Sequence, residues 1–282
     1  MTQTLRKLGI VAGGGALPGS LIKACQKEGR PFFVLALKGH ADPALLPDGI
    51  PMKWMRMGAV GFGFAEMKRQ GAQDIVLIGN VRRPSLMELR PDLRGLKFFA
   101  KAGVKALGDD GLLRAVINEI EADGFKIVGA DTIIPSLLAD SGIFGQVVPT
   151  SADWEDIEKG IQTVQILGAA DVGQAVIVQQ GIVLSVEAIE GTAALIRRTG
   201  ALKREGGGGV LVKMAKPKQE RRVDLPTIGP QTVKDVYEAG LKGIAVEAGA
   251  VLMADAEACV KLADKLGIFI VGIHKKEGGN KA

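Results

Sequence analysis

Residues 8–18 read LGIVAGGGALP, and this stretch predicts the start of a parallel α/β fold. The first five residues form a short apolar run suited to a buried strand. Three glycines follow, and Pro18 then suits the first turn of a helix, where a missing N–H is not needed. We therefore expect a strand, a tight glycine turn and a helix over residues 19–28.

The same alternation of strand and helix continues along the first half of the chain. Apolar runs predict strands over residues 32–37, 53–57, 75–78 and 126–129, with a helix near 64–70 before the third of these. Their continuous apolar character indicates strands buried on both faces, as in a parallel sheet with right-handed crossovers. We predict an N-terminal domain with a mostly parallel sheet over residues 1–133.

The second half predicts a distinct α/β domain. Residues 134–150 have weak periodicity and are interpreted as a linker, so the C-terminal domain is expected to cover residues 151–282. Ser151 is the predicted N-cap of its first helix. Gln180-Gly181 separates two apolar strands, which predicts a hairpin. Further helices are expected over 231–239 and 255–266, with short strands at 244–246, 251–252 and 269–272.

Composition narrows the classes of function. The 282 residues are 47% hydrophobic and 4% aromatic, with a net charge of +5 and only two histidines and two cysteines. The positive excess favours anionic ligands, whereas few aromatic residues argue against stacking on single-stranded nucleic acid. A zinc site or a His-rich two-metal site is not expected. Residues 1–15 lack the apolar core of a signal peptide, and no run approaches the roughly 20 residues of a membrane span, so we expect a cytoplasmic protein.

The glycine turn allows two interpretations. Gly13 and Gly15 match the first two glycines of a dinucleotide fingerprint, but Pro18 takes the third position. Lys38 follows the second strand, where that fingerprint needs an acidic residue. We prefer an anion-binding turn whose backbone N–H groups face a phosphate or ribose. A tight turn without a ligand is the alternative.

A basic stretch in the second half is the most unusual feature of the sequence. Residues 210–229 read VLVKMAKPKQERRVDLPTIG: an apolar strand, a cluster of lysines and arginines, Asp224, and a Pro/Gly turn. This density of cations is typical either of the rim of an anion site or of a solvated loop. Asn80 and Arg82 follow a strand of the first domain, where ligands of open α/β sheets bind. Glu187 and Glu190 form an acidic pair that could hold Mg²⁺.

A second basic stretch, residues 94–107, predicts a helix with lysines along one face. Lys97, Lys101 and Lys105 recur every four residues, and Leu96, Phe99, Ala100 and Gly103 are expected on the opposite, buried face. One interpretation is a core helix with a solvated lysine face. The other is a surface near an anionic membrane.

Over nearly its whole length the chain resembles the UDP-2,3-diacylglucosamine pyrophosphatases of the LpxI type. The motifs that carry the resemblance are LGIVAGGGALP, GNVRRP, GDDGLLRAVINEIEADGF, SVEAIEGT, LVKMAKPKQERRVDLPTIGPQT and GLKGIAVEAG. The resemblance implies a Rossmann-like N-terminal domain, a separate C-terminal domain and a ligand between them. It also implies a hydrolase of lipid A biosynthesis that cleaves UDP-2,3-diacylglucosamine into UMP and 2,3-diacylglucosamine 1-phosphate (lipid X), with Mg²⁺ (or Mn²⁺) as cofactor.

The resemblance also implies which residues form the site. It places the essential aspartate of the family at Asp224, and we expect Lys213 and Glu190 to be catalytic and Asp224 and Glu190 to bind the metal. Residues of the same motifs are expected to bind substrate: Gly13, Gly14, Gly15, Leu17, Pro18, Asn80, Arg82, Thr192, Lys216, Gln219, Arg222, Thr227, Ile228 and Gly229. One position departs from the family: Ala193 stands where an aspartate usually follows EGT. That aspartate either binds metal or caps the helix, in which case Thr192 suffices.

Two other functions are compatible with the pattern. An NAD(P)-dependent oxidoreductase is disfavoured by Pro18 and Lys38. A nucleotide- or lipid-binding module without activity is suggested by Ala193. For the pyrophosphatase we expect a lipid-nucleotide substrate, a homodimer, peripheral contact with the cytosolic face of the inner membrane, and no nucleic acid.

Overall fold

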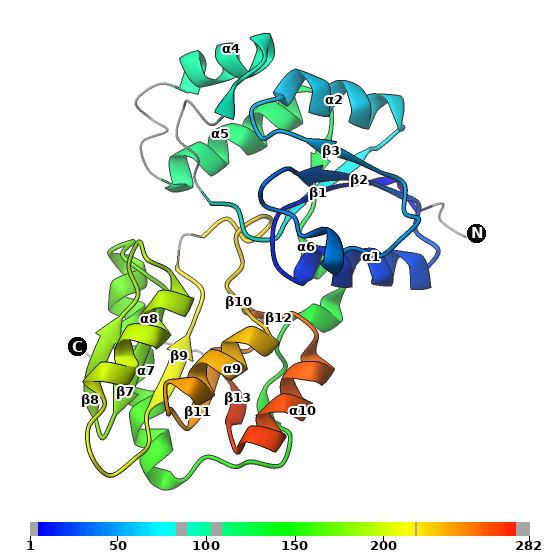
Figure 1. Cartoon of the computed structure of the whole chain (residues 1–282). Helices are drawn as coiled ribbons and strands as arrows, with labels where there is room; N and C mark the ends of the chain where they lie inside the picture. Colours follow the sequence, from blue (N-terminus) through cyan, green and yellow to red (C-terminus); the bar gives the residue numbers. More distant parts are fainter. Residues whose placement is uncertain (1–4, 83–88, 103–108, 218, 275–282) are drawn as a thin grey trace, which may run out of the picture. The chain divides into compact units, whose positions relative to one another are not determined.

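A computed structural model of the chain describes residues 5–82, 89–102, 109–217 and 219–274 (Figure 1). The chain divides into two compact units. Unit 1 contains Met1–Pro135 together with Glu220–Asp224, and unit 2 contains Ser136–Gln219 together with Leu225–Ala282. Both units are α/β structures, which confirms the predicted fold class.

Unit 1 is built on a parallel sheet. Over the described residues it has five strands in the order β3-β2-β1-β4-β5, all parallel: β1 (Leu8–Ala12), β2 (Phe32–Leu37), β3 (Met52–Met55), β4 (Asp74–Ile78) and β5 (Lys126–Ile127). Each strand of this sheet overlaps one of the predicted apolar runs. The order brings β1 and β4 together at the centre, so the turns that leave their carboxyl ends are neighbours.

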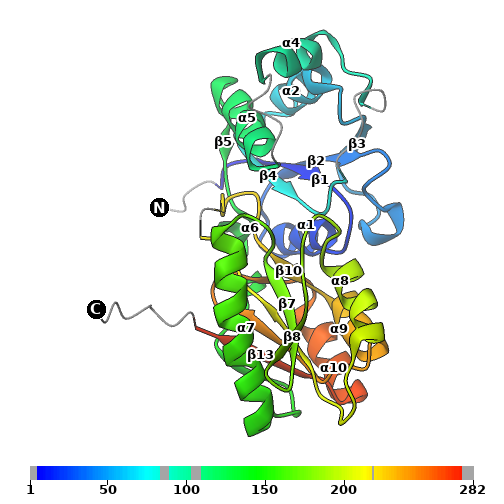
Figure 2. The ribbon, with the colours of Figure 1, turned by 90° about the vertical axis from the view of Figure 1, so that its left-hand side faces the viewer.

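Helices cover both faces of this sheet (Figures 1 and 2). The first helix, α1 (Leu17–Lys27), lies on one face, and α2 (Val60–Arg69) and α5 (Asp109–Ala122) lie on the other. Buried side chains of α2 and α5, such as Met67 and Ile120, share a core with Phe33 and Ile75 of the strands. The remaining helices of the unit are α4 (Leu93–Ala102), which packs against α2 and α5, and α6 (Ala130–Ile133).

Unit 2 contains a mixed sheet. Its order is β6-β13-β11-β9-β7-β8, with strands β6 (Gly142–Phe144), β7 (Ala175–Gln179), β8 (Ile182–Val186), β9 (Val210–Lys213), β11 (Gly243–Glu247) and β13 (Phe269–Ile273). The predicted hairpin is confirmed: β7 and β8 are antiparallel, and Gln180 and Gly181 both have positive φ, as its tight turn requires. The segment expected to link the domains contributes β6 to the edge of this sheet.

Unit 2 also has helices on both faces. Figure 2 shows α7 (Ser151–Ala169) on one face and α8 (Thr192–Thr199), α9 (Pro230–Glu238) and α10 (Ala256–Leu266) on the other. The N-cap of α7 is Thr150, which forms a capping box with Asp153, so the prediction of Ser151 was wrong by one residue. Short 3₁₀ helices cover Pro43–Leu45, Pro135–Leu137 and Gly200–Leu202.

A two-stranded parallel pair, β10 (Thr227–Ile228) and β12 (Leu252–Met253), completes unit 2. Residues 226–229 were predicted to be only a turn. That prediction was wrong because Ile228 is fully buried and pairs with Met253, a contact with a distant segment that local sequence does not reveal.

Both cysteines are buried and unbonded, as expected from their apolar contexts. Burial raises the pKa of Cys25 to about 11 and that of Cys259 to about 12, so both remain thiols near neutral pH. Among the helices in the described part of the chain, none has the length and apolar character needed to cross a bilayer.

Candidate functional site

The glycine turn after β1 pairs with the turn after β4. The N–H of Gly13 donates to the carbonyl of Ile78 at 2.8 Å, and Gly14 and Asn80 exchange two backbone hydrogen bonds of 2.8 Å each. The N–H groups of Gly13 and Gly14 therefore already have backbone acceptors, so the predicted contact of these two residues with a ligand is not made through those N–H groups in this structure.

Close packing explains why glycines occupy this turn. A Cβ on Gly13 would lie 2.7 Å from the Asn80 carbonyl oxygen, and one on Gly14 would lie 2.8 Å from the carbonyl oxygen of His40. Gly15 has φ +84°, which favours glycine. The N–H groups of Gly15 and Ala16 have no backbone acceptor among the described residues, and these donors are the ones left for an anion.

The other predicted residues of unit 1 surround this turn. Pro18 lies in the first turn of α1, as predicted, and is buried with Leu17. The side-chain amide of Asn80 lies beside Gly15, with Nδ2 3.5 Å from an ideal Cβ position there. Asn80 and Arg82 are both exposed at the carboxyl end of β4. An anion at the Gly15 N–H would thus have the side-chain amide of Asn80 beside it, with Arg82 two residues further along the chain.

In unit 2 a buried hydrogen-bond network joins three residues of the predicted site. Lys213, at the end of β9, donates from Nζ to Thr192 Oγ1 at 2.9 Å and to the carbonyl oxygen of Thr227 at 2.8 Å. Thr192 in turn donates to Glu187 Oε1 at 2.6 Å, and Glu187 Oε2 accepts from the N–H of Gln174 at 3.0 Å. Lys213 and Glu187 are each only 5% exposed. The hydroxyl of Thr192 therefore connects a buried cation to a buried anion.

Of the acidic pair, the structure places Glu187 in this buried network and Glu190 outside it. Glu190 is exposed and pairs with Arg198 of α8, with Oε1 and Nη2 2.7 Å apart. The hydrogen bond from Arg198 lowers the pKa of Glu190 and keeps it ionised. The sequence indicated Glu187 as one member of the acidic pair, but only Glu190 was expected to be catalytic and to bind the metal. The signal for Glu187 is its position directly after a strand and five residues before Thr192.

The residues that follow Lys213 are held by contacts within unit 2. Lys216 Nζ lies 2.9 Å from Asp171 Oδ1, and Gln219 accepts from the N–H of Lys216 and donates to the side chain of Gln174. The N–H of Ala215 donates to a carboxylate oxygen of Glu247 at 2.9 Å. Glu247 was given no role from the sequence, although it directly follows the strand predicted over 244–246. Lys218 lies outside the described residues.

The turn that ends the basic stretch has a structural role. Gly229 has an extended backbone and is the N-cap residue of α9, where its N–H donates to Thr232 Oγ1 at 3.2 Å. Ile228 is buried in the core of unit 2, so its side chain is not available to a ligand. Thr227 takes part through its carbonyl oxygen, which holds Lys213.

Residues 220–224 of the basic stretch belong to unit 1. Arg222 binds Glu220 through two hydrogen bonds of 2.9 and 3.0 Å and Glu121 of α5 through one of 2.7 Å. Hydrogen bonding to these carboxylates, Glu220 first, raises the pKa of Arg222 and lowers that of Glu220. Val223 packs against the core beneath α5. The charge of Arg222, a predicted substrate contact, is thus already engaged by two carboxylates.

Asp224 follows this anchored segment directly. Its N–H donates to the carbonyl oxygen of Glu220 at 3.0 Å, and its side chain is partly buried. Within the described part of the chain, no hydrogen bond or ion pair is found for the Asp224 carboxylate. It is the one predicted catalytic carboxylate without an assigned protein partner there.

Two family models match the chain, and together they span most of it. The LpxI N-terminal domain matches residues 7–137, and the LpxI C-terminal domain matches residues 140–271. The chain belongs to the LpxI family. A Caulobacter vibrioides member named UDP-2,3-diacylglucosamine pyrophosphatase LpxI is 42% identical over 280 residues, which cover 97% of this chain and 99% of that protein. Among solved structures, CobK precorrin-6A reductase covers 96% of this chain and 90% of its own with 12% identity and a TM-score of 0.32, too low to bear on fold or function.

The LpxI matches assign Asp224 to the C-terminal domain by sequence, whereas its contacts are in unit 1. Ala193, where the resemblance led us to expect an aspartate, is exposed in the first turn of α8. The N-cap residue of this helix is Gly191, no side-chain cap is found, and Thr192 is the first helical residue. The hydroxyl of Thr192 donates to Glu187, so the described contacts do not support the alternative in which Thr192 takes the place of a capping aspartate.

The described residues contain no group of three or more His, Cys, Asp or Glu side chains that could hold a metal by themselves. Mg²⁺ usually keeps several waters and is held by one or two carboxylates together with substrate phosphates. Asp224 fits that requirement because its carboxylate has no assigned partner. Glu190 fits it less well, since an ion would compete with Arg198.

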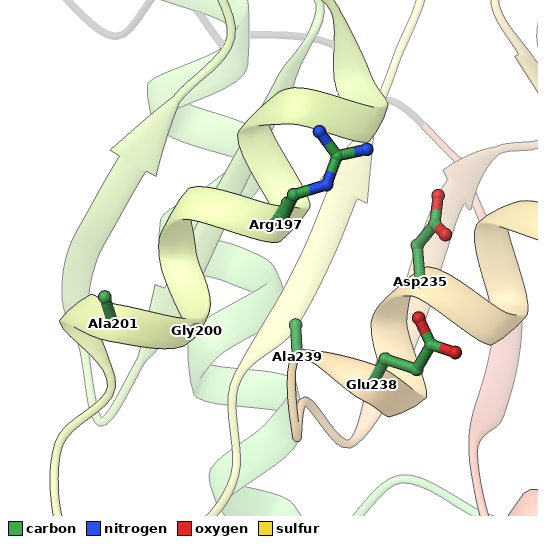
Figure 3. Close-up of a pocket in the computed structure, with 6 residues that line it drawn as sticks. All are labelled: Arg197, Gly200, Ala201, Asp235, Glu238 and Ala239. Carbon is green, nitrogen blue, oxygen red and sulfur yellow. The ribbon is translucent and has the colours of Figure 1, made fainter.

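A pocket of about 180 Å³ lies between α8 and α9, away from the residues discussed above (Figure 3). Its lining consists of Arg197, Gly200, Ala201, Asp235, Glu238 and Ala239. Figure 3 shows the carboxylates of Asp235 and Glu238 on α9, across from Arg197 on α8. Two carboxylates against one guanidinium do not favour a diphosphate, and no predicted site residue lines this pocket.

Proposed function

We propose that this protein hydrolyses the diphosphate of UDP-2,3-diacylglucosamine, giving UMP and 2,3-diacylglucosamine 1-phosphate. The observation that carries the proposal is the 42% identity, over nearly the full length of both chains, to a protein that bears the name of this activity. Hydrolysis of a P–O–P bond requires charge neutralisation and in-line positioning of water rather than covalent chemistry by the protein.

Lys213 is the proposed cation for the diphosphate. A buried ammonium is costly unless it is hydrogen-bonded, and Thr192 and Thr227 hold this one in a fixed position. Fixed charges in a site of low exposure stabilise developing negative charge without reorganisation during the reaction. We propose that Lys216, Gln219 and Arg222 act around it, with Arg222 acting mainly through its contacts to Glu121 and Glu220.

The N-terminal contribution to substrate binding is proposed at the glycine turn. The N–H groups of Gly15 and Ala16 remain as donors, and Asn80 and Arg82 lie at the carboxyl end of the adjacent strand. A helix N-terminus adds a partial positive charge that favours phosphate. In this proposal Gly13 and Gly14 act by allowing the two turns to approach each other, and Pro18 by starting α1.

Asp224 is the proposed catalytic carboxylate. A carboxylate gains nothing from binding an anionic substrate directly, because like charges repel at short range. It acts if it orients the attacking water or holds Mg²⁺, and both effects stabilise the transition state. The alternative of an ion pair with Arg222 is disfavoured, because that guanidinium binds Glu220 and Glu121.

The proposed cofactor is Mg²⁺ (or Mn²⁺), with Asp224 as its protein ligand and Glu190 as a second candidate. When bound, such an ion would neutralise phosphate charge and lower the pKa of a coordinated water. The bond that breaks in our proposal joins the β-phosphorus to the bridging oxygen. Water adds to the β-phosphorus, UMP leaves with the bridging oxygen, and the two protons of the water pass to the phosphate products or to solvent.

The test is incubation of the purified protein with UDP-2,3-diacylglucosamine and Mg²⁺, with UMP and the sugar phosphate measured by mass spectrometry. We expect both products in equal amounts, and we expect Asp224→Ala prepared in parallel to form them at least about 10²-fold more slowly. Absence of UMP, with or without NAD(P)-linked oxidation of the substrate, would contradict the proposal. Tight binding without turnover would identify a binding module instead.

A further inference from the structure

The described contacts of α4 with the rest of unit 1 come from Gly95, Arg94 and the buried Phe98. Gly95 lies so close to the segment before α2 that a Cβ there would be 2.7 Å from the carbonyl oxygen of Gly58. Arg94 Nη2 lies 3.1 Å from Glu119 and 2.6 Å from Asp123, and its guanidinium lies over the ring of Phe64 at 4.2 Å. These contacts fix which face of α4 points away from the unit.

The outward face of α4 is apolar as well as basic. Leu93 is 81% exposed and Leu96 is 53% exposed, and both lie on the same helical face as the exposed Lys97 and Ala100. The sequence prediction placed Leu96 and Ala100 on the buried face, and that prediction was wrong. The side chains of Phe99 and Lys101, and residues 103–108, lie outside the described part of the structure.

An exposed aromatic residue of α2 extends this surface. The N–H of Phe62 donates to Asp92 Oδ2 at 3.3 Å, so Phe62 lies next to the residue that precedes α4. Asp92 also accepts from the N–H groups of Gly61 and Gly95, which joins the starts of α2 and α4. We call Phe62, Leu93, Leu96 and Lys97 the α4 surface. All four are exposed.

The charge around the α4 surface is positive. Residues 89–102 contain four cationic residues (Arg90, Arg94, Lys97 and Lys101) and one acidic residue, Asp92. The guanidinium of Arg94 is neutralised by Glu119 and Asp123, which leaves Arg90 and Lys97 as the exposed cations whose side chains the structure describes in this segment. The carboxylate of Asp92 is occupied by backbone N–H groups, and Arg90 is exposed like Lys97. Exposed leucines beside lysine and arginine are typical of helices that lie in the headgroup region of an anionic bilayer.

We propose that the α4 surface docks on an anionic phospholipid bilayer, with Leu93, Leu96 and Phe62 inserted between headgroups and Lys97 and Arg90 against lipid phosphates. A second copy of this chain is a poorer partner, because a two-fold contact centred on this surface would bring its cations close to their own copies and supply no anionic group to pair with them. The proposal goes beyond the hydrolytic reaction. Its test uses no substrate, so it can fail or succeed independently of the proposed function.

The experiment is cosedimentation of the full chain with vesicles of phosphatidylethanolamine and phosphatidylglycerol, compared with vesicles of phosphatidylcholine alone. We expect binding to the anionic vesicles that weakens as salt is added. The double variant L93S/L96S should bind at least about tenfold more weakly, since it loses two insertable side chains. Lys97→Glu should reduce binding about tenfold at low salt and flatten the salt dependence.

Matched controls come from unit 2. Ile166→Ser removes an apolar side chain that is 71% exposed on α7, and Lys159→Glu reverses an exposed charge on the same helix. Both should bind vesicles like the unaltered chain. If the α4 variants also bind like the unaltered chain, the proposal is overturned. If the L93S/L96S variant has a lower molar mass in solution than the unaltered chain but binds vesicles equally well, the α4 surface is a contact between copies, and the proposal is overturned too.

Loss of fold is the remaining ambiguity, and a second variant removes it. If L93S/L96S melts at lower temperature than the unaltered chain, Leu93→Ser alone is used, because a side chain this exposed contributes little to packing. We expect Leu93→Ser to weaken vesicle binding several-fold with an unchanged melting temperature. Unchanged binding by this folded variant would overturn the proposal.

Discussion

Thr192→Val should lower both the free energy of unfolding and the rate of hydrolysis, because it removes the hydroxyl that joins Lys213 to Glu187. That hydroxyl accepts from Lys213 Nζ at 2.9 Å and donates to Glu187 Oε1 at 2.6 Å. Hydrogen bonds to charged groups contribute about 1.5–3 kcal/mol each. Since Lys213 keeps its bond to Thr227 and Glu187 keeps the Gln174 N–H, we expect the lower end of the sum, a loss of about 3 kcal/mol in unfolding free energy.

The assay pairs urea unfolding, followed by circular dichroism, with UMP release. We expect kcat/KM to fall at least about tenfold, since an ammonium that is held less firmly stabilises the transition state less well. Thr199→Val is the matched control: it lies on the same helix, is fully buried, and bonds only to the neutral Ser185 hydroxyl and Leu195 carbonyl. It should cost about 1–2 kcal/mol of stability and leave kcat/KM unchanged.

A double-mutant cycle with Glu187→Gln decides whether the three residues act as one unit. Coupled residues deviate from additivity by more than about 0.5 kcal/mol. If the stability losses of Thr192→Val and Glu187→Gln add within that limit, the hydrogen bonds from Glu187 through Thr192 to Lys213 are not energetically coupled. If Thr192→Val has the same kcat/KM as Thr199→Val, then Lys213 does not depend on Thr192, and the reasoning is refuted.

The remaining predictions concern Asp224 and the segment that carries it. Asp224→Ala should lower single-turnover rates by about 10²-fold or more while substrate binding is kept or tightened, and near-normal turnover would end the catalytic assignment. Arg222→Glu and Glu121→Arg should each lower turnover, and the double variant with the two charges exchanged should recover part of the lost turnover. If the double variant is no more active than Arg222→Glu, Arg222 binds substrate itself. In Mg²⁺ titrations, Asp224→Asn should change the Mg²⁺ concentration that gives half-maximal rate, whereas Glu190→Gln should change that concentration by less than about threefold. The reverse pattern would make Glu190 the metal ligand.

Buried strands were predictable because their signal is local. Residues 32–37 are apolar over their whole length, and their burial follows from that alone. In the hairpin, β7 is buried throughout, whereas the edge strand β8 is only partly buried. Leu96 shows the limit of the same reasoning. Its helical periodicity gave the correct helix but the wrong buried face, because the face is chosen by contacts of Gly95 and Arg94 with other helices.

The site was predictable as a set of motifs but not as a set of contacts. Gly13 and Gly14 were identified as special, yet their N–H groups pair with a strand turn far along the chain, which leaves Gly15 and Ala16 as the donors. The role of Glu187 depends equally on Lys213, which arrives from a different strand. These hydrogen bonds join residues far apart in the sequence, so composition and periodicity do not predict them.

Hydrolysis in ¹⁸O-labelled water tests the proposed reaction most directly. The purified protein is incubated with UDP-2,3-diacylglucosamine and Mg²⁺, and both products are weighed by mass spectrometry. Water attack on the β-phosphorus predicts one ¹⁸O atom in the diacylglucosamine 1-phosphate and none in UMP. Label in UMP would place the attack at the α-phosphorus, and the absence of both products would contradict the proposed function.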